Sequence, residues 1–248
     1  MKSLTDTFKL YNDVEIPCVG LGTWQSTDET AKNAVLSALS LGYRLIDTAA
    51  AYGNERGVGA GVNASGLKRE EIFVTSKLRN AHHGYKATLE AFEGTMERLG
   101  LEYLDLYLIH WPNPVQFRTH WEESTAGTWA AFEELYKAGK IRSIGISNFM
   151  PHHIETLMET ATVKPMVNQL KLCPGITQPE IVKYCSANGI LVEAYSPFGT
   201  GTVFANDEMK RLSAKCMLQN SIYFIRLLLW NHICRKCKKT HVCHNMHT

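Results

Sequence analysis

The chain has 248 residues, 45% of them hydrophobic, which is enough for one barrel-sized domain with a substantial core. The formal net charge is +2, but residues 217–248 carry five Lys/Arg and no acid, which leaves 21 Lys/Arg against 24 Asp/Glu before them. This balance argues against a nucleic-acid-binding surface, and the polar start MKSLTDTFKLYND argues against an export signal or a membrane anchor there.

The seven cysteines are an odd number and are scattered, with only the last three clustered. That pattern is not typical of a secreted disulfide framework, so we expect reduced thiols and a cytoplasmic protein.

In chain order, the first predicted element is a hairpin, FKLYNDVEIP, with Asn12-Asp13 at its tip. A short apolar run, a turn and an amphipathic helical segment then recur about every 25 to 40 residues. The predicted strands are Cys18–Gly22, Arg44–Asp47, Ile72–Lys77, Leu104–His110, Ser143–Ser147, Val167–Leu170 and Leu191–Tyr195. The predicted helices include DETAKNAVLSALS, ended by Gly42, and Tyr85–Leu99, Thr128–Lys137, His152–Thr160 and Pro179–Asn188.

Strands buried on both faces and joined by helices indicate parallel pairing with right-handed crossovers. Closing such units predicts an α/β fold, a (β/α)8 TIM barrel whose amino-terminal mouth is plugged by the hairpin. An open doubly wound sheet is the alternative. No linker rich in Pro, Gly or Ser divides the chain, so residues 1–216 are predicted to form one domain.

Polar residues stand at or just past the carboxyl ends of the predicted strands. They are Asp47, Lys77, His110, Ser147, Asn148, Gln169, Tyr195 and Ser196. Each taken singly is more often a turn former, a helix cap or a rim residue. In a barrel, however, these ends converge on one mouth, where barrel enzymes hold their active sites. The set therefore predicts an active site.

An acid, an amine, a phenol and an imidazole at one mouth suit proton delivery to a carbonyl group. A phenol is a weak acid near neutrality, and a nearby ammonium lowers its pKa. Lys77 could supply that charge to Tyr52, while Asp47 holds Lys77 in place. His110 could donate a hydrogen bond to the substrate oxygen as negative charge develops there.

The motifs GLGTW, IDTAAAYGNE, VTSKL, LDLYLIHWP, SIGISNF, PMVNQL and EAYSPFG occur in this order. Over residues 6–216 the chain resembles the aldo-keto reductase family, particularly its small bacterial and protozoal aldehyde reductases. The resemblance implies a (β/α)8 barrel, carbonyl reduction, and NADPH bound in extended form without a Rossmann domain. It also implies a catalytic tetrad of Asp47, Tyr52, Lys77 and His110, with Tyr52 as the general acid.

The same resemblance implies further binding residues. Those for the cofactor are Gly22, Thr23, Trp24, Asp47, Ser147, Asn148, Gln169, Tyr195, Ser196, Pro197 and Phe198, with Tyr195 stacked on the nicotinamide. Those for the substrate are Trp24, Tyr52, Arg79, His110 and Trp111. The implied partner is a small carbonyl compound, with no nucleic acid, no membrane and no metal; a monomer is favoured, although the sequence leaves the oligomeric state open.

Two stretches inside the barrel region need separate interpretation. GVGAG, Gly57 to Gly61, lacks the third glycine of a dinucleotide loop and no strand ends before it, so it is predicted to be a closely packed second helix. Arg79 stands where relatives commonly carry tryptophan. It either faces the pocket and favours carboxylate-bearing substrates or points into solvent.

Residues 217–248 match no eighth βα unit and contain no Gly, Ala, Pro, Asp or Glu. We expect an aberrant ending, for example a frameshift, and a barrel that is incomplete at its eighth unit. A zinc site at the clustered Cys and His residues and a membrane-attached helix are weaker alternatives. Two functions therefore compete: an NADPH-dependent carbonyl reductase, and a catalytically weak remnant with at most a binding role.

Overall fold

The computed structural model describes residues 3–215, so the expectations for residues 217–248 lie outside the described part of the chain. Contacts group the described residues into two compact units. The first comprises residues 3–170 and Pro179–Glu193, and the second comprises Lys171–Gln178 and residues 194–215. The assignment of residues 1–216 to one domain stays a prediction.

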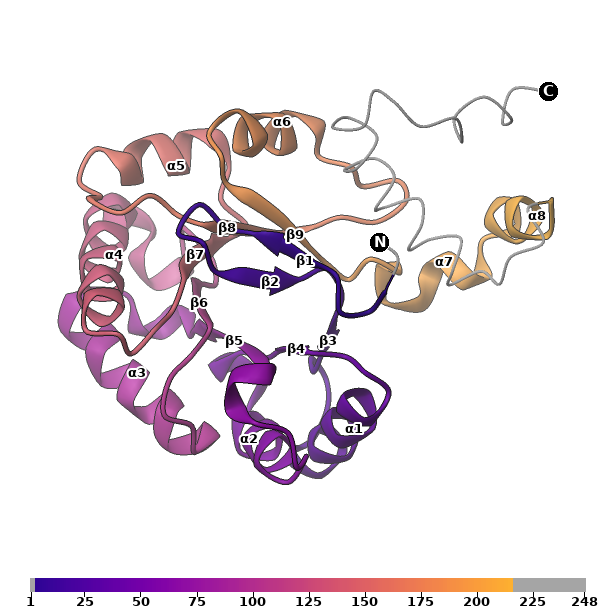
Figure 1. Cartoon of the computed structure of the whole chain (residues 1–248). Helices are drawn as coiled ribbons and strands as arrows, with labels where there is room; N and C mark the ends of the chain where they lie inside the picture. Colours follow the sequence, from indigo (N-terminus) through magenta and orange to yellow (C-terminus); the bar gives the residue numbers. More distant parts are fainter. Residues whose placement is uncertain (1–2, 216–248) are drawn as a thin grey trace. The chain divides into compact units, whose positions relative to one another are not determined.

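The first unit is an α/β barrel of parallel strands preceded by an N-terminal hairpin (Figure 1). Its strands are β3 (Gly20–Gly22), β4 (Leu45–Asp47), β5 (Phe73–Leu78), β6 (Leu106–Ile109), β7 (Ile144–Ser147), β8 (Val167–Lys171) and the start of β9 (Leu191–Tyr195). They neighbour one another in chain order, and every pairing from β3 to β8 is parallel. A doubly wound sheet would reverse its strand order, so the barrel prediction is confirmed.

Six α-helices of the first unit lie outside the strands (Figure 1). They are α1 (Asp28–Ser40), α2 (Glu55–Asn63), α3 (Tyr85–Leu99), α4 (Trp121–Lys137), α5 (Pro151–Met158) and α6 (Pro179–Ala187). The 3₁₀ turns η1 (Ala50–Tyr52), η2 (Arg69–Glu71), η3 (Asn80–His82) and η4 (Val115–His120) lie between them. The predicted helices are present, although α4 begins earlier than expected.

Helix α1 shows how the local sequence produces these elements. The side chain of Thr27 accepts a hydrogen bond from the Thr30 backbone N–H, which caps the helix start. Ala31, Val35 and two later apolar residues of the same face are buried. The chain leaves the helix at Gly42, whose φ of 97° is readily available only to glycine. The polar face stays in water while the apolar stripe packs inward.

The glycines of GVGAG lie in α2, as predicted, and allow close helix packing. A Cβ on Gly57 would lie 2.0 Å from the Asp28 carbonyl oxygen, and one on Gly59 would lie 1.8 Å from that of Leu99. Real Cβ atoms essentially never approach backbone so closely. These glycines therefore serve contacts with α1 and with the end of α3 rather than phosphate binding.

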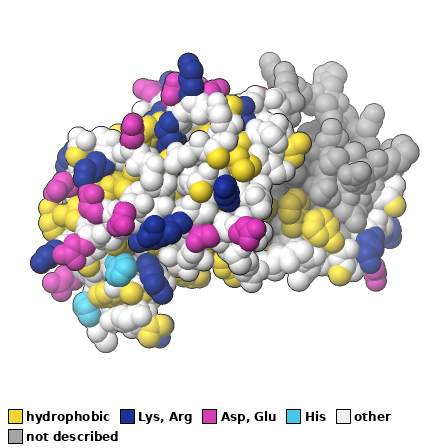
Figure 2. All heavy atoms as spheres, turned by 90° about the horizontal axis from the view of Figure 1, so that it is seen from below, with side chains coloured by type: hydrophobic (Ala, Val, Ile, Leu, Met, Phe, Trp, Pro, Cys, Tyr) yellow, Lys and Arg dark blue, Asp and Glu magenta, His cyan; other side chains and the backbone are white. Residues whose placement is uncertain are grey.

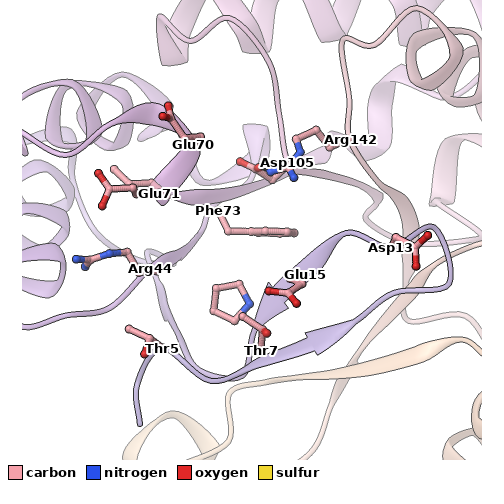
Figure 3. A pocket seen from close by; sticks show the side chains of 12 residues that line it. Thr5, Thr7, Asp13, Glu15, Arg44, Glu70, Glu71, Phe73, Asp105 and Arg142 are labelled. Atoms are coloured by element: carbon pink, nitrogen blue, oxygen red, sulfur yellow. Dashed lines mark hydrogen bonds and ion pairs between the residues drawn. The ribbon is translucent and has the colours of Figure 1, made fainter.

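The hairpin of β1 (Thr7–Lys9) and β2 (Glu15–Pro17) lies at the amino ends of the strands, as predicted (Figure 1). At its tip, Asn12 Nδ2 donates to the Arg142 carbonyl oxygen at 3.0 Å, just before β7. Between the hairpin and the strand ends is a cavity of about 390 Å³ (Figure 3). On its wall the buried carboxylate of Asp105 accepts hydrogen bonds from Arg69 and Arg142, each at 2.7 Å. These hydrogen bonds join η2 and the segment before β7 to the segment before β6.

The second unit contains the end of β9, the 3₁₀ turn η5 (Gly199–Gly201), α7 (Thr202–Ala205) and α8 (Asp207–Lys215). Within it, the backbone of Cys173 exchanges hydrogen bonds with that of Ile176 at 3.0 and 2.8 Å. No helix among residues 3–215 is both long and apolar enough to cross a membrane. In the same stretch, no group of three or more His, Cys, Asp or Glu side chains is arranged to hold a metal ion.

Figure 2 shows one face of the molecule. Among its coloured residues, Lys and Arg side chains are interspersed with Asp and Glu side chains, and no continuous basic patch is visible there. The charges on this face are therefore mixed in sign.

Candidate active site

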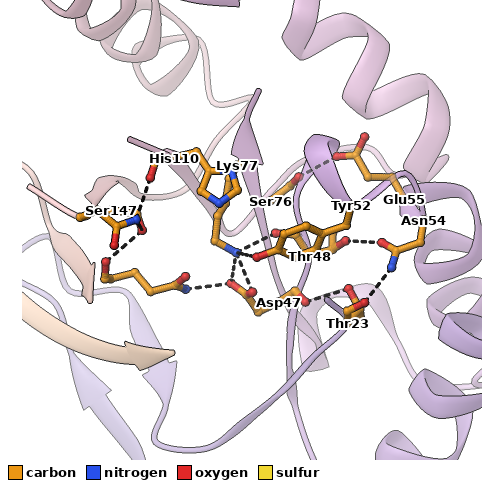
Figure 4. Close-up of polar contacts among 12 residues, drawn as sticks. Thr23, Asp47, Thr48, Tyr52, Asn54, Glu55, Ser76, Lys77, His110 and Ser147 are labelled. Carbon is orange, nitrogen blue, oxygen red and sulfur yellow. Dashed lines mark hydrogen bonds and ion pairs between the residues drawn. The ribbon is translucent and has the colours of Figure 1, made fainter. Parts of the chain in front are cut away.

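Four side chains from separate strands or turns meet at the carboxyl ends of the strands (Figure 4). Asp47 ends β4, Lys77 is the second-last residue of β5, Tyr52 ends η1, and His110 directly follows β6. The pairing of Asp47 with Thr75 places the carboxylate beside the strand that carries the lysine. The structure thus brings together the four residues that the sequence nominated.

Lys77 is the centre of this cluster and is only 1% exposed. Its Nζ donates to both carboxylate oxygens of Asp47, at 2.6 and 2.8 Å, and to the Thr48 carbonyl oxygen at 2.9 Å. Nζ also lies 3.4 Å from the Tyr52 hydroxyl oxygen. Three oxygens therefore compensate the buried ammonium, and the phenol lies within its reach.

The charges in this cluster act on one another. Burial lowers the pKa of Lys77, but the charge of Asp47, together with Tyr52 and the Asp47 hydrogen bonds, raises that pKa above its ordinary value. Burial, together with the charges of Asp47 and Glu193, raises the pKa of Tyr52 above its ordinary value despite the lowering by Lys77. The lowering expected from the sequence is thus present but outweighed. In the free protein Tyr52 keeps its proton, and Lys77 keeps its charge.

His110 lies beside Tyr52 with the ring centroids 5.9 Å apart and the planes at 76°. Burial, assisted by the Lys77 charge, lowers the pKa of His110 to about 4. At neutral pH the imidazole is therefore uncharged and has one N–H to donate. It can offer a hydrogen bond to an oxygen near Tyr52 without adding a positive charge.

A row of hydroxyl and amide groups continues the site on the next two strands. Ser147 ends β7, and its hydroxyl donates to the Gln169 carbonyl oxygen at 2.9 Å. Asn148 follows with a φ of 63° and donates its side-chain amide to the His110 carbonyl oxygen at 3.0 Å. Gln169 donates from Nε2 to Asp47 Oδ2 at 2.8 Å. The left-handed backbone of Asn148, a conformation that asparagine tolerates, turns its amide toward the site.

The first loop supports Asp47 from the other side. Thr23 donates from its backbone N–H and its hydroxyl to the Asp47 carbonyl oxygen, at 3.0 and 3.1 Å. Gly22 pairs with Asp47 across the strands. The buried amide of Asn54 donates to the Thr23 carbonyl oxygen at 2.8 Å and accepts from Thr48 Oγ1 at 2.9 Å. The sequence did not single out Asn54, although it lies inside the IDTAAAYGNE motif.

Glu193 is a second side chain that the sequence interpretation missed. It lies on β9, and its Oε2 is buried without a hydrogen-bond partner among the described residues. Burial and the charge of Asp47 raise the pKa of Glu193 to about 7, against smaller lowering effects of Gln169 and Lys77. The EAYSPFG motif contains this glutamate, and an acid in a strand that lines a barrel was the available signal.

The remaining residues predicted to bind cofactor or substrate are two tryptophans, one arginine and the segment from Tyr195 to Phe198. Tyr195, Ser196, Pro197 and Phe198 belong to the second unit, and their roles stay predictions. Trp24 and Trp111, which follow Thr23 and His110 in the chain, are 52% and 44% exposed. Arg79 follows β5 and is also exposed. Such exposed indoles fit the rim of a pocket.

Comparison with known proteins shows which family and which proteins the chain is similar to. The model described as Aldo/keto reductase family matches residues 18–242. The chain is 49% identical over 214 residues to glyoxal reductase of Bacillus subtilis (strain 168), covering 86% of this chain and 75% of that protein. It is 48% identical over 194 residues to 9,11-endoperoxide prostaglandin H2 reductase of Trypanosoma cruzi (strain CL Brener), covering 77% and 65%.

Solved structures show the same fold. MGS-M4, an aldo-keto reductase enzyme from a Medee basin deep-sea metagenome library, superposes with a TM-score of 0.84 at 41% identity, covering 91% of this chain and 81% of that one. A mutant of Gox0644 in complex with NADPH superposes with a TM-score of 0.83 at 36% identity, covering 93% and 81%.

Proposed function

The chain belongs to the aldo/keto reductase family of oxidoreductases, and from that membership we propose that it reduces small aldehydes and ketones with NADPH, using Tyr52 as the proton donor. The observation that carries the proposal is the Lys77 ammonium held by Asp47 within 3.4 Å of the Tyr52 hydroxyl. A buried ammonium beside a phenol is suited to stabilise the phenolate that forms when the proton leaves.

The proposed reaction adds one hydride and one proton across a C=O bond. When bound, NADPH supplies the hydride to the carbonyl carbon and is oxidised to NADP⁺. Tyr52 delivers its proton to the carbonyl oxygen, so that the carbonyl π bond breaks and an alcohol forms, and Tyr52 regains a proton from water. The neutral imidazole of His110 donates a hydrogen bond to the same oxygen and holds it near Tyr52.

The side chains at the site fit the nicotinamide end of the cofactor. A carboxamide has one acceptor oxygen and two N–H donors, and Ser147, Asn148 and Gln169 offer both kinds of group in one row. We therefore propose that these three hold the carboxamide, with Gly22, Thr23, Trp24 and Asp47 beside them. The cofactor-binding roles expected of Tyr195 to Phe198 from the sequence stay predictions. The crystal structure of a Gox0644 mutant is in complex with NADPH, which supports the same cofactor here.

NADPH binding and turnover test the proposal together. We expect NADPH to quench tryptophan fluorescence, because Trp24 and Trp111 directly follow Thr23 and His110 in the chain. We also expect NADPH to support reduction of a dicarbonyl such as glyoxal. Circular dichroism establishes that the sample is folded. A folded chain that neither binds NADPH nor reduces the dicarbonyl would favour the alternative of a catalytically weak remnant.

The exposed cation Arg79 supports a proposal about substrate class. If the Arg79 guanidinium faces the substrate pocket, it favours carbonyl compounds that carry a carboxylate. We expect Arg79→Trp to lower kcat/KM for a keto acid by about tenfold relative to a neutral aldehyde, the effect of one weak charged contact. Arg56→Trp, at an exposed arginine of α2, is the matched control. An unchanged preference in the Arg79 variant would mean that this arginine points into solvent.

The proposal also concerns the cellular location and the oligomeric state. We propose a cytoplasmic protein with reduced thiols, because the seven cysteines are odd in number and scattered along the sequence. A monomer is the proposed oligomeric state, as favoured from the sequence.

A further inference from the structure

Glu55 is a buried charged side chain that the proposed mechanism does not use. It begins α2, and its side chain is only 1% exposed. Its Oε1 accepts a hydrogen bond from the Ser76 hydroxyl at 2.6 Å (Figure 4). Its Oε2 accepts a hydrogen bond from Arg98 Nε at 2.7 Å. Side chains of two other elements, β5 and α3, therefore satisfy both oxygens of the carboxylate.

The hydrogen bond to Ser76 closes a short ring around the proposed proton donor. From Tyr52 the chain runs three residues to Glu55, which bonds Ser76. The next residue of β5 is Lys77, whose Nζ lies 3.4 Å from the Tyr52 hydroxyl (Figure 4). The backbone turns at Gly53 with a φ of 72°, which glycine adopts without strain. A ring this short limits how far the phenol and the ammonium can separate.

Glu55 holds β5 from the side opposite to the ammonium. Side chains alternate between the two faces of a strand, so Ser76 and Lys77 point in opposite directions. Lys77 bonds Asp47 within the four-residue cluster, whereas Ser76 bonds Glu55 of α2. Both side chains of β5 are buried. Glu55 can therefore fix the strand that carries the lysine through the Ser76 hydroxyl.

Asn54, the residue before Glu55, holds the same segment to the other side of the site. Its side-chain amide donates to the Thr23 carbonyl oxygen at 2.8 Å and accepts from Thr48 Oγ1 at 2.9 Å. The Thr48 carbonyl oxygen in turn accepts from Lys77 Nζ at 2.9 Å. Two adjacent side chains thus join this segment to the first loop, to the end of β4 and to β5.

Helix α3 makes room for the second partner of Glu55. A Cβ on Gly94 would lie 3.0 Å from Nη1 of Arg98. Glycine is unfavourable inside a helix, and here its missing side chain leaves space for the guanidinium. Arg98 is 36% exposed, whereas Ser76 is fully buried. Arg98 therefore balances the charge of the carboxylate from its outer side, and Ser76 provides the link to β5.

We propose that Glu55 is a positioning residue, which fixes the distance between the Tyr52 hydroxyl and the Lys77 ammonium through the Ser76 hydroxyl. The inference rests on the proposed function, in which Tyr52 donates the proton and Lys77 stabilises its phenolate. Misplacement of such a pair by about 1 Å can cost about a hundredfold in rate. Arg98 is outside the ring, so its hydrogen bond to Glu55 serves stability.

Two single substitutions separate positioning from stability. Ser76→Ala removes the hydrogen bond inside the ring and leaves Arg98 to balance Glu55. Arg98→Met, the matched control, removes the other hydrogen bond and leaves the ring closed. Because a buried charge without its ion-pair partner is costly, Arg98→Met should lower the urea midpoint of unfolding more than Ser76→Ala does. Ser76→Thr keeps a hydroxyl and is the conservative variant.

The first readout is NADPH-dependent reduction. We expect kcat to fall about ten- to a hundredfold in Ser76→Ala, because the proton donor and the ammonium lose their fixed separation. It should stay near the wild-type value in Arg98→Met and be largely restored in Ser76→Thr. NADPH binding, measured by fluorescence, should be unchanged in all three variants.

The second readout is the phenolate absorbance of Tyr52 during an alkaline titration, which needs neither cofactor nor turnover. It is obtained in each background as the difference from the same variant carrying Tyr52→Phe. Since the charge of Lys77 lowers the pKa of Tyr52, a larger separation weakens that effect. The titration midpoint should therefore rise in Ser76→Ala and stay near the wild-type value in Arg98→Met.

An unchanged kcat together with an unchanged Tyr52 midpoint in Ser76→Ala would overturn the inference. An equal loss of kcat in Arg98→Met would also overturn it, because the closed ring would then have no special role. If Ser76→Ala does not fold, Ser76→Cys decides, because a thiol is a weak donor of similar size. Wild-type kcat and midpoint in that variant would contradict the proposal.

Failure of the proposed function has a different signature. The wild-type protein would then lack reduction, or reduction would persist in Tyr52→Phe, whatever the absorbance titration shows. The titration tests the position of Tyr52 relative to Lys77 in either case.

Discussion

Replacement of Tyr52 by phenylalanine is expected to lower NADPH-dependent carbonyl reduction by about 10²- to 10⁴-fold, the contribution of a positioned general acid. The change removes one oxygen and keeps the ring that packs edge-on against His110. Lys77 retains its contacts with Asp47 and Thr48, so the cluster does not collapse. The loss should therefore appear in kcat, measured by NADPH oxidation, while NADPH binding measured by fluorescence stays near the wild-type value.

Tyr85→Phe provides the matched control for this experiment. Tyr85 is half-exposed on α3, and its hydroxyl donates to Glu134 away from the four-residue cluster. Removing that hydroxyl should leave turnover unchanged. Retention of more than about a tenth of wild-type turnover in Tyr52→Phe would refute the assignment of Tyr52, because a general acid contributes at least a hundredfold.

The strands and most helices could be predicted because their signals are local. Buried β-branched runs separated by helical periodicity give the barrel, and the positions of Asp47 and Lys77 at strand ends follow from the run lengths. Helix α4 was predicted to begin at Thr128, yet it begins at Trp121. Its first turns are rich in polar residues, so they lack an apolar stripe, although Glu122 and Glu123 suit a helix start.

The finer chemistry of the site could not be predicted in the same way. The pKa of Tyr52 depends on burial, which raises it, and on Lys77, which lowers it. Several strands together exclude solvent from the phenol, and no local sequence pattern indicates that burial. Glu193 lies in a strand that was predicted to line the barrel, but it was missed because an acid in a strand is usually expected to face solvent. Sequence spacing identified the groups, whereas only their packing determines which of them hold protons.

Replacement of Lys77 by methionine is expected to abolish measurable reduction and to lower the free energy of unfolding by about 3 kcal/mol, since breaking a buried ion pair leaves one charge uncompensated. Methionine fills a similar volume, so the loss reflects charge rather than a cavity. The Asp47 carboxylate would then retain the amide of Gln169, at 2.8 Å, but lose both hydrogen bonds from Lys77. Denaturant unfolding and NADPH oxidation measure the two effects separately.

The double variant Asp47→Asn with Lys77→Met separates stability from chemistry. Removing both charges should recover most of the lost unfolding free energy, because a neutral pair no longer carries the cost of a lone buried carboxylate. Turnover should stay absent, because no ammonium remains to stabilise the Tyr52 phenolate. If the double variant recovered activity along with stability, Lys77 would serve the fold alone, and the proton would have to come from a group whose acidity does not depend on it. The pair is retained because the ammonium is required at Tyr52, and Asp47 is the partner that makes its burial tolerable.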